Sequence, residues 1–323
     1  MTHPNVVPAP QRRDIAGGAL LVDRLLAGIN KRQRMPLHQM DIRDARNAYA
    51  DACVQLDVGA VEGVRTQVLS VVAPDALELR VTQPPAVDVT QVLVWVHGGG
   101  FCVGNAASTD LLCRWFSAHL QCAVVSVDYR LAPEHSVRQA LDDVIAAITW
   151  AAREFPGARL DVLGDSAGAA LALPAVAHCV SEAGVCVEGL VLCYPLAAPG
   201  AVTASRERYA QGHYLTMADV EWMHGLALLD ECDALLQPLQ RFHWPQGMPT
   251  SLVVLPHRDP LFDEGQALVH HLRATGCVVS ELHMPDFIHG CLHMGGLFPQ
   301  VRGMHEHIAN FVRPPTGGEE LNK

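Results

Sequence analysis

The segment LDVLGDSAGAALALPAVAHCV, residues 160–180, decides how this chain folds. It opens with a short apolar run, Leu160–Leu163, that predicts a buried strand, and its second half predicts a helix. Between the two, Gly164 and Gly168 stand two residues on either side of Ser166. A turn this sharp leaves no room for side chains at the glycine positions and exposes the serine above the sheet, at a helix N-terminus. We therefore predict that Ser166 is a nucleophile.

Similar short apolar runs recur along the chain at helix-length intervals. They are Val92–Val96, Ala123–Val127, Leu190–Cys193, Ser251–Leu255 and Val278–Leu282. Runs that are apolar at nearly every position are typical of parallel strands buried on both faces. Between two of them, Leu141, Val144 and Ile148 fall at helical spacing and predict an amphipathic helix over the sheet. The alternation predicts an α/β fold with a mostly parallel, doubly wound central sheet flanked by helices.

Two stretches do not fit this alternation. The N-terminal arm, residues 1–50, contains the helical pattern ALLVDRLLAGI before the first clear strand. Residues 197–246 separate two strands by more than a crossover helix requires. Their large apolar side chains are Met217, Trp222, Met223, Phe242 and Trp244. Because lids of such sheets lie at the carboxyl ends of the strands, we predict that residues 197–246 form a lid over the active site.

A second motif, His97-Gly98-Gly99-Gly100, follows the strand VLVWV directly. Backbone N–H groups approach a substrate closely where no Cβ intervenes. Acyl transfer needs at least two such donors for the developing oxyanion. We predict that Gly99, Gly100 and Ala167 supply them, and that His97 braces the loop.

A serine nucleophile needs a histidine base and an acid that orients the base. In this kind of fold they follow the serine in the order acid, histidine. Asp259 and His289 each follow a predicted strand, so the two loops meet beside the serine. The weaker rivals are Asp263 and Glu264, expected to open the next helix, His283, expected at a strand end, and His293, expected beyond the loop. The two histidines are expected to be satisfied structural residues.

The composition excludes several classes of protein. Half of the 323 residues are apolar and 18% are charged, which argues against a disordered chain. A net charge of −11 argues against binding to nucleic acid. The ten cysteines form no CxxC pair and are expected to be buried thiols in a reducing compartment. With no signal peptide and no apolar run long enough to span a bilayer, the chain is expected to be cytoplasmic.

Taken together, the motifs resemble the hormone-sensitive lipase family of α/β-hydrolase esterases. They are HGGG at 97–100, YRLAPE at 129–134, GDSAG at 164–168, DPLxDEG at 259–265 and HG at 289–290. The resemblance spans about residues 75–312. It implies a cap formed by residues 1–50 and 197–246, a core of residues 51–196 and 247–314, and a tail of residues 315–323. It also implies that the YRLAPE motif is a structural brace, and it is compatible with a homodimer.

The resemblance implies a serine carboxylesterase with Ser166 as nucleophile, His289 as base and Asp259 as orienting acid. We expect a small ester of short to medium acyl length as the substrate, in a pocket edged by Trp and Met, with no metal, cofactor or stable membrane insertion. The histidine pairs 270–271 and 305–307 lack metal-site spacing. Two alternatives stay open. One is a ligand receptor on the same scaffold, although the plant gibberellin receptors that resemble this family have lost the catalytic histidine. The other is an amidase, thioesterase or lactonase with the same triad.

Overall fold

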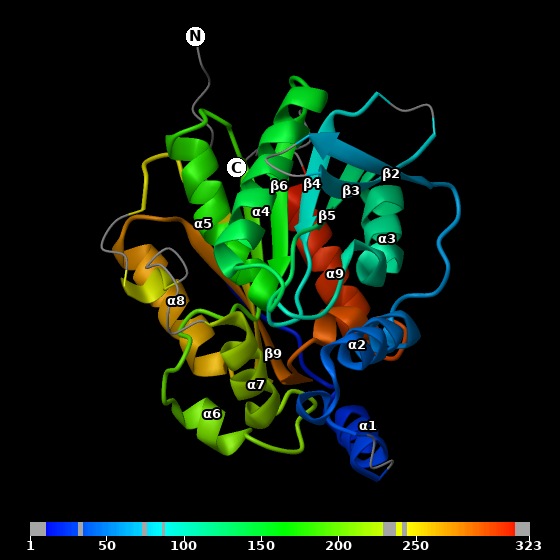
Figure 1. The fold of residues 1–323 in the computed structure, drawn as a ribbon, viewed down its shortest axis with the longest axis vertical. Helices are drawn as coiled ribbons and strands as arrows, with labels where there is room; N and C mark the ends of the chain where they lie inside the picture. The colour runs from blue at the N-terminus through cyan, green and yellow to red at the C-terminus, as the bar shows by residue number, and fades with distance from the viewer. Residues whose placement is uncertain are drawn as a thin grey trace, which may run out of the picture.

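The computed structural model of the chain describes residues 11–31, 35–72, 76–85, 88–228, 237–240 and 244–313. In this part of the chain the strands form one nine-stranded sheet, in the order β1-β9-β8-β7-β6-β4-β5-β3-β2 (Figure 1). The strands are β1 (Arg12–Asp14), β2 (Arg65–Val72), β3 (Ala76–Gln83), β4 (Gln91–Val96), β5 (Ala123–Asp128), β6 (Arg159–Asp165), β7 (Gly189–Cys193), β8 (Thr250–Arg258) and β9 (Val279–Ile288). Only the β2–β3 and β3–β5 pairs are antiparallel in this sheet. The predicted α/β fold with a mostly parallel sheet is confirmed.

Strand β4 shows why the continuous apolar runs were informative. All six of its residues are buried. Val92, Val94 and Val96 pack into the hydrophobic core on one face of the sheet. Leu93 and Trp95 pack into the core on the other face. A strand with two buried faces cannot alternate apolar with polar residues, and this one does not.

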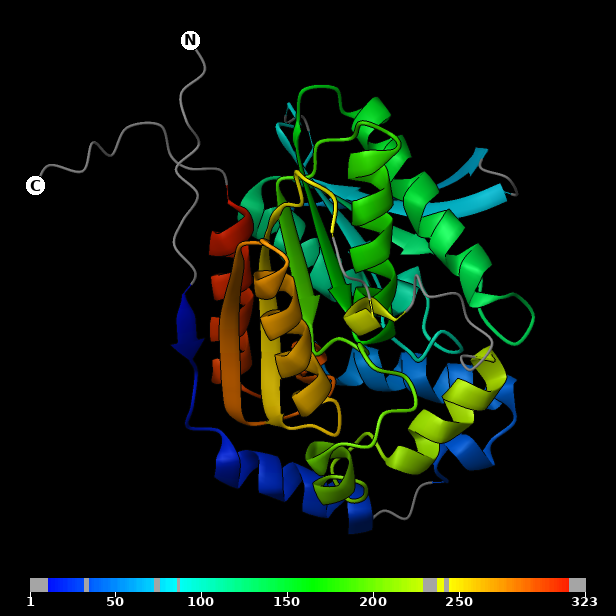
Figure 2. The same ribbon diagram turned by 90° about the vertical axis from the view of Figure 1, so that its left-hand side faces the viewer.

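Helices cover both faces of the sheet (Figure 2). The core on one face includes residues of α4 (Val137–Glu154), α5 (Ala167–Ser181) and α8 (Phe262–Ala274). The core on the other face includes residues of α1 (Ala19–Lys31), α3 (Asp110–Leu120) and α9 (Pro299–Val312). The predicted amphipathic helix is α4, whose apolar stripe is buried.

Several boundaries differ from the sequence expectation. The N-terminal arm is not only helical, because β1 pairs in parallel with β9 at the edge of the sheet. Helix α2 (Ile42–Leu56) continues past residue 50, the expected end of the arm. The prediction that His283 ends its strand is wrong, since β9 continues to Ile288. The expected tail, residues 315–323, lies outside the described residues.

Several helices gather beyond the carboxyl ends of the parallel strands, and α1 belongs both to this group and to the core on one face of the sheet (Figures 1 and 2). From the N-terminal arm come α1, the short helix η1 (Leu37–Gln39) and α2. From residues 197–246 come α6 (Ala204–Arg208) and α7 (Met217–Ala227). His38 Nδ1 lies 2.8 Å from Asp219 Oδ1, so the arm and α7 are in direct contact. We call this group of helices the cap.

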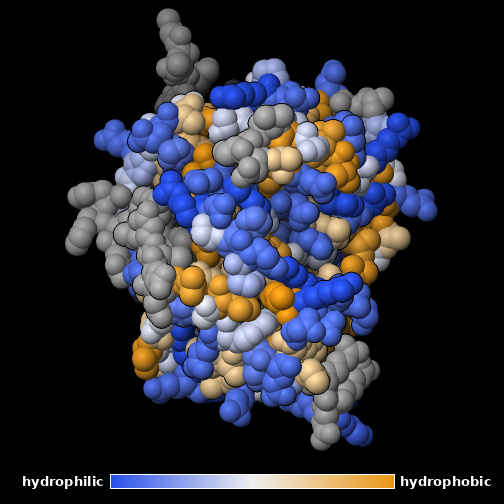
Figure 3. All heavy atoms as spheres, viewed as in Figure 1, coloured by the Kyte–Doolittle hydropathy of each residue, from blue (hydrophilic) through white to orange (hydrophobic). Residues whose placement is uncertain are grey.

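The face shown in Figure 3 is mainly hydrophilic, with hydrophobic side chains scattered among polar ones. No helix of the described residues is long and apolar enough to cross a bilayer. The nine cysteines in this part of the chain are free thiols, and all are buried except Cys186, which is exposed, and Cys277, which is partly buried. Cys232 lies outside the described residues.

Candidate active site

Ser166 lies in the turn between β6 and α5, with φ 53° and ψ −118°. This positive φ is unusual for a residue with a side chain. Its N–H donates to Cys193 O on β7 at 2.9 Å, which fixes the turn. A Cβ at Gly164 would lie 2.5 Å from Gly168 O, and one at Gly168 would overlap Val96 O. Close backbone approach therefore requires both glycines, as the sequence predicted.

The structure brings the three predicted triad residues together. His289 Nε2 lies 2.9 Å from Ser166 Oγ, and His289 Nδ1 lies 2.8 Å from Asp259 Oδ2. The other oxygen of Asp259 accepts from Leu261 N at 2.8 Å. Asp259 is fully buried, while Ser166 is partly accessible. At these distances the three side chains form a continuous hydrogen-bonded chain from the Asp259 carboxylate, which Leu261 N holds in place, to the Ser166 hydroxyl.

The predicted oxyanion donors lie beside the serine. Gly99 and Gly100 line the same pocket and have φ of 120° and 57°, which favour glycine. Ala167 is the first residue of α5, where a helix leaves N–H groups without an intrahelical acceptor. Gly98 N, in contrast, donates to Asp165 Oδ1 at 2.9 Å and is occupied. The arrangement can present backbone donors to an oxygen near Ser166.

His97 has the bracing contacts that were predicted for it. Its Nδ1 lies 2.8 Å from Gly98 O, and its ring stacks on Tyr129 at 4.2 Å between centroids. The Tyr129 hydroxyl donates to His97 O at 2.8 Å. Burial lowers the pKa of His97, so the ring is neutral and Nδ1–H can donate to the carbonyl. Its contacts hold the glycine loop from behind.

The YRLAPE segment ties the same loop to the cap, consistent with the expected brace. Arg46 of α2 donates to Cys102 O at 2.9 Å and to Ala132 O at 3.0 Å. Its guanidinium also forms a paired contact with Glu134, at 2.9 and 2.6 Å. One arginine from the arm therefore fixes both the YRLAPE segment and the residues that follow the glycine loop.

Asp263 and Glu264, the two rival acids, contact residues of the cap and do not contact His289. Asp263 accepts from Ser205 N at 2.8 Å. Glu264 pairs with Arg206 at 2.7 Å, and although burial raises its pKa to about 7, the arginine opposes this shift. Both lie in the first turn of α8, as predicted. They anchor α6, a role that the sequence analysis did not assign to them.

The rival histidines differ from each other. His283 is satisfied, with His257 Nε2 at 2.8 Å and Glu281 Oε2 at 3.0 Å. His293, in the short helix η6 (Cys291–Met294), lines the pocket, and neither of its ring nitrogens has a hydrogen-bond partner. The prediction of a satisfied structural residue is therefore met for His283 but only in part for His293, whose Nε2 has an ion-pair contact with Asp165 Oδ2 at 3.6 Å and no hydrogen bond.

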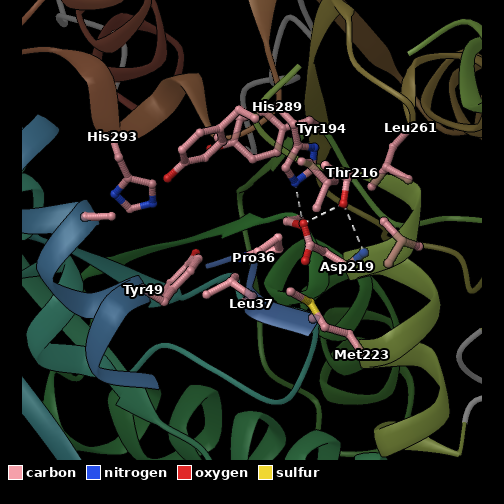
Figure 4. Close-up of a pocket in the computed structure, with 18 of the residues that line it drawn as sticks. Pro36, Leu37, Tyr49, Tyr194, Thr216, Asp219, Met223, Leu261, His289 and His293 are labelled. Atoms are coloured by element: carbon pink, nitrogen blue, oxygen red, sulfur yellow. Dashed lines mark hydrogen bonds between the residues drawn. The ribbon is translucent and has the colours of Figure 1, made fainter. Parts of the chain in front are cut away.

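The triad opens into a pocket of about 480 Å³ beneath the cap (Figure 4). Its walls include Leu37 and Tyr49 from the arm and Met223 from α7. The expected Trp and Met edge is met for methionine, since Met35, Met40 and Met223 line the pocket, whereas Trp222 and Trp244 do not. Phe242 lies outside the described residues. The arm residues carried no sequence signal, since nothing in their pattern shows where the arm packs.

A buried histidine of α9 supports the loop that follows His289. His305 Nε2 lies 2.7 Å from Leu292 O, and burial lowers its pKa to about 4. The ring stays neutral in the folded state at a pH where the unfolded chain binds a proton. Stability from this group is complete above about pH 6.5 and is lost as pH falls towards about 4.

We expect His305→Phe to reduce this acid sensitivity. Between about pH 7.5 and about pH 5, the wild-type free energy of unfolding should fall by about 2 kcal/mol more than that of the variant. Urea titrations at the two pH values measure the difference. His119→Phe, an exposed change on α3, is the control and should keep the wild-type dependence. Equal acid sensitivity in all three proteins would contradict the prediction.

Comparison with known proteins decides the family. A sequence profile of the α/β-hydrolase fold family matches residues 93–293. The chain belongs to the α/β-hydrolase family. An ethyl acetate hydrolase of Pseudomonas putida is 27% identical over 317 residues, which cover 91% of this chain and 98% of that enzyme. The structure of an esterase from the archaeon Pyrobaculum calidifontis matches this α/β-hydrolase with a TM-score of 0.81 and 26% identity, over 91% of this chain and 97% of that one.

A relative with a different activity is also similar. A gibberellin receptor of Arabidopsis thaliana is 30% identical over 227 residues, which cover 65% of this α/β-hydrolase and 65% of the receptor. Proteins similar to this chain therefore include both hydrolases and a receptor, and the site residues have to distinguish between the two activities.

Proposed function

We propose that this α/β-hydrolase is a serine carboxylesterase that cleaves short- to medium-chain esters through an acyl-enzyme intermediate. The observation that carries the proposal is the hydrogen-bonded chain Asp259–His289–Ser166, of which Ser166 and His289 line a pocket of about 480 Å³. Relatives named as an ethyl acetate hydrolase and an esterase support carboxylic esters as the substrate class. A receptor needs no such proton relay, so the intact chain favours hydrolysis.

The geometry supports a two-step reaction. His289 Nε2 accepts the Ser166 proton as Oγ attacks the ester carbonyl carbon, and the oxyanion is held by backbone N–H groups. The imidazolium, stabilised by Asp259, then gives the proton to the departing alcohol oxygen, and the C–O bond breaks to leave an acyl-serine. Water repeats the sequence, and the acid is released as the serine regains its proton.

Release of p-nitrophenol from a series of p-nitrophenyl esters tests both the activity and the size of the pocket. We expect kcat/KM to be highest between acetate and hexanoate and to be at least about tenfold lower for laurate. The reason is that a long chain must displace Leu37 or Met223, which close the pocket. No turnover of any ester by pure protein would favour the receptor function. Equal turnover of butyrate and laurate would contradict the short-chain preference.

A pair of methionine variants tests the cause of this preference. Met223→Ala should raise laurate hydrolysis relative to butyrate hydrolysis, because Met223 lines the pocket. Met217→Ala, on the same helix but outside the pocket lining, is the matched control and should leave the ratio unchanged.

A further inference from the structure

Two polar side chains of the pocket have buried polar atoms without a hydrogen-bond partner. Tyr194 and His293 both line it, and they are 1% and 5% exposed. The Tyr194 hydroxyl and both ring nitrogens of His293 are buried without a hydrogen bond. Leaving a buried polar group unsatisfied costs about 1–3 kcal/mol. Such groups beside a nucleophile point to a ligand that completes their hydrogen bonds.

The surrounding contacts fix both residues close to the nucleophile. Tyr194 follows β7 with φ 39°, and its N–H donates to Val254 O at 2.8 Å. Its ring packs on the His289 ring, with 4.7 Å between centroids. His293 Nε2 forms an ion pair with Oδ2 of Asp165, the residue before the serine, at 3.6 Å, a distance longer than a hydrogen bond.

Figure 4 shows how these side chains are arranged around the pocket. His293 and Tyr49 lie on the side formed by η6 and α2, while Asp219 and Met223 come from α7 on the opposite side. Tyr194 lies beside His289, and both Tyr194 and His293 line the pocket.

The charges around these groups define what they can bind. Burial raises the pKa of the Tyr194 hydroxyl, which therefore keeps its proton and can donate it. Burial lowers the pKa of His293, but Asp165 and Asp57 raise it by more, so the ring offers N–H donors. The same two carboxylates disfavour an anion. The complementary ligand group is a neutral oxygen that accepts hydrogen bonds.

We propose that Tyr194 and His293 form a polar subsite that recognises a second, neutral oxygen of the substrate, such as an ether, hydroxyl or keto oxygen near the ester. The preferred substrates are then oxygenated esters rather than purely hydrocarbon ones. This proposal rests on the proposed esterase function and adds a substrate class to it. Tyr194 and His293 are specificity residues, since they contact the substrate without taking part in bond cleavage.

Two matched pairs of esters test the subsite, each replacing one methylene by an ether oxygen. p-Nitrophenyl methoxyacetate is compared with p-nitrophenyl butyrate, and 2-methoxyethyl butyrate with n-butyl butyrate. The ratio of kcat/KM within each pair is measured in the wild type, Tyr194→Phe and His293→Leu. Because the ratios are compared between proteins, the intrinsic reactivity of each ester cancels.

We expect each variant to lower the preference for the oxygenated ester about tenfold in at least one pair, because a buried hydrogen bond is lost. Tyr194→Phe keeps the ring against His289, so the ratio within each pair, and not the rate for either ester alone, is the readout. Tyr209→Phe makes the same chemical change outside the pocket lining and should keep the wild-type ratio.

Unchanged ratios in both pairs would mean that the two residues hold only a buried water. An equal loss for both esters of a pair would mean a structural role. Either result would overturn the proposal.

Binding to Ser166→Ala separates the subsite from the chemistry. Ligand-observed NMR titrations with the same ester pairs compare Ser166→Ala with Ser166→Ala/Tyr194→Phe. Selective weakening of the methoxy esters, about tenfold, supports the subsite even if the wild type hydrolyses no ester and the esterase function fails. Equal weakening of both esters, or no weakening, overturns the subsite whether or not the esters are hydrolysed.

Discussion

Ser166→Ala is expected to lower kcat for p-nitrophenyl butyrate by about 10⁵- to 10⁶-fold. The variant lacks the oxygen that would form the acyl bond, and among the described residues no other hydroxyl has the 2.9 Å contact that His289 makes with Ser166. The residual rate should come from backbone donors and substrate binding alone. Initial rates measured with pure protein, together with thermal melting, separate loss of the nucleophile from loss of the fold.

The acyl-serine itself is a second readout of the same change. Intact-mass spectrometry after an acid quench should show one added butyryl group in the wild type and none in Ser166→Ala. Ser181→Ala, at the other end of α5, is the control and should keep both activity and adduct. Retention of more than about 1% of wild-type activity by Ser166→Ala would disprove its role as nucleophile.

Asp259→Asn is expected to lower kcat about 10⁴-fold. The carboxylate accepts from His289 Nδ1 at 2.8 Å, and Leu261 N holds its other oxygen at 2.8 Å. An asparagine amide turned towards the imidazole would favour the wrong tautomer. Asp263→Asn is the matched control, because Asp263 accepts from Ser205 N in the cap and should lose less than about tenfold. If Asp263→Asn loses more activity than Asp259→Asn, the orienting acid has been assigned to the wrong residue.

The inner strands and their loops could be predicted because burial on both faces leaves a simple sequence signal. In β4, five successive apolar residues, Val92–Val96, mark the strand, and the glycine loop follows directly. Parallel strands end at one edge of the sheet, so residues after different strands meet there. This rule predicted that Asp259 and His289 lie beside Ser166, without knowledge of any contact.

The outer strands and the arm could not be predicted in the same way. The three residues of β1, Arg12–Asp14, are all exposed and charged, so neither periodicity nor apolar character marks the strand. Its position next to β9 depends on backbone pairing, which leaves no side-chain pattern. Tyr49 lines the pocket from α2. Arg46 of the same helix donates to Cys102 O after the glycine loop, and this contact joins segments that are distant in the sequence.

The status of His293 shows a further limit of the sequence. Motif position correctly selected His289 as the histidine beside the serine, since it follows β9. Whether a second histidine four residues later is satisfied depends on what surrounds its ring, and Asp165 stops just short of hydrogen-bond distance. A local sequence pattern cannot predict which groups lie within hydrogen-bond distance of a buried histidine ring.

The anchoring of α6 limits how substrate reaches the serine. Arg206 and Ser205 are fastened to Glu264 and Asp263, only a few residues after Asp259. An outward movement of α6 would displace the loop that carries Asp259 and would misalign the His289 imidazole. Substrate and products are therefore expected to exchange without an outward movement of α6.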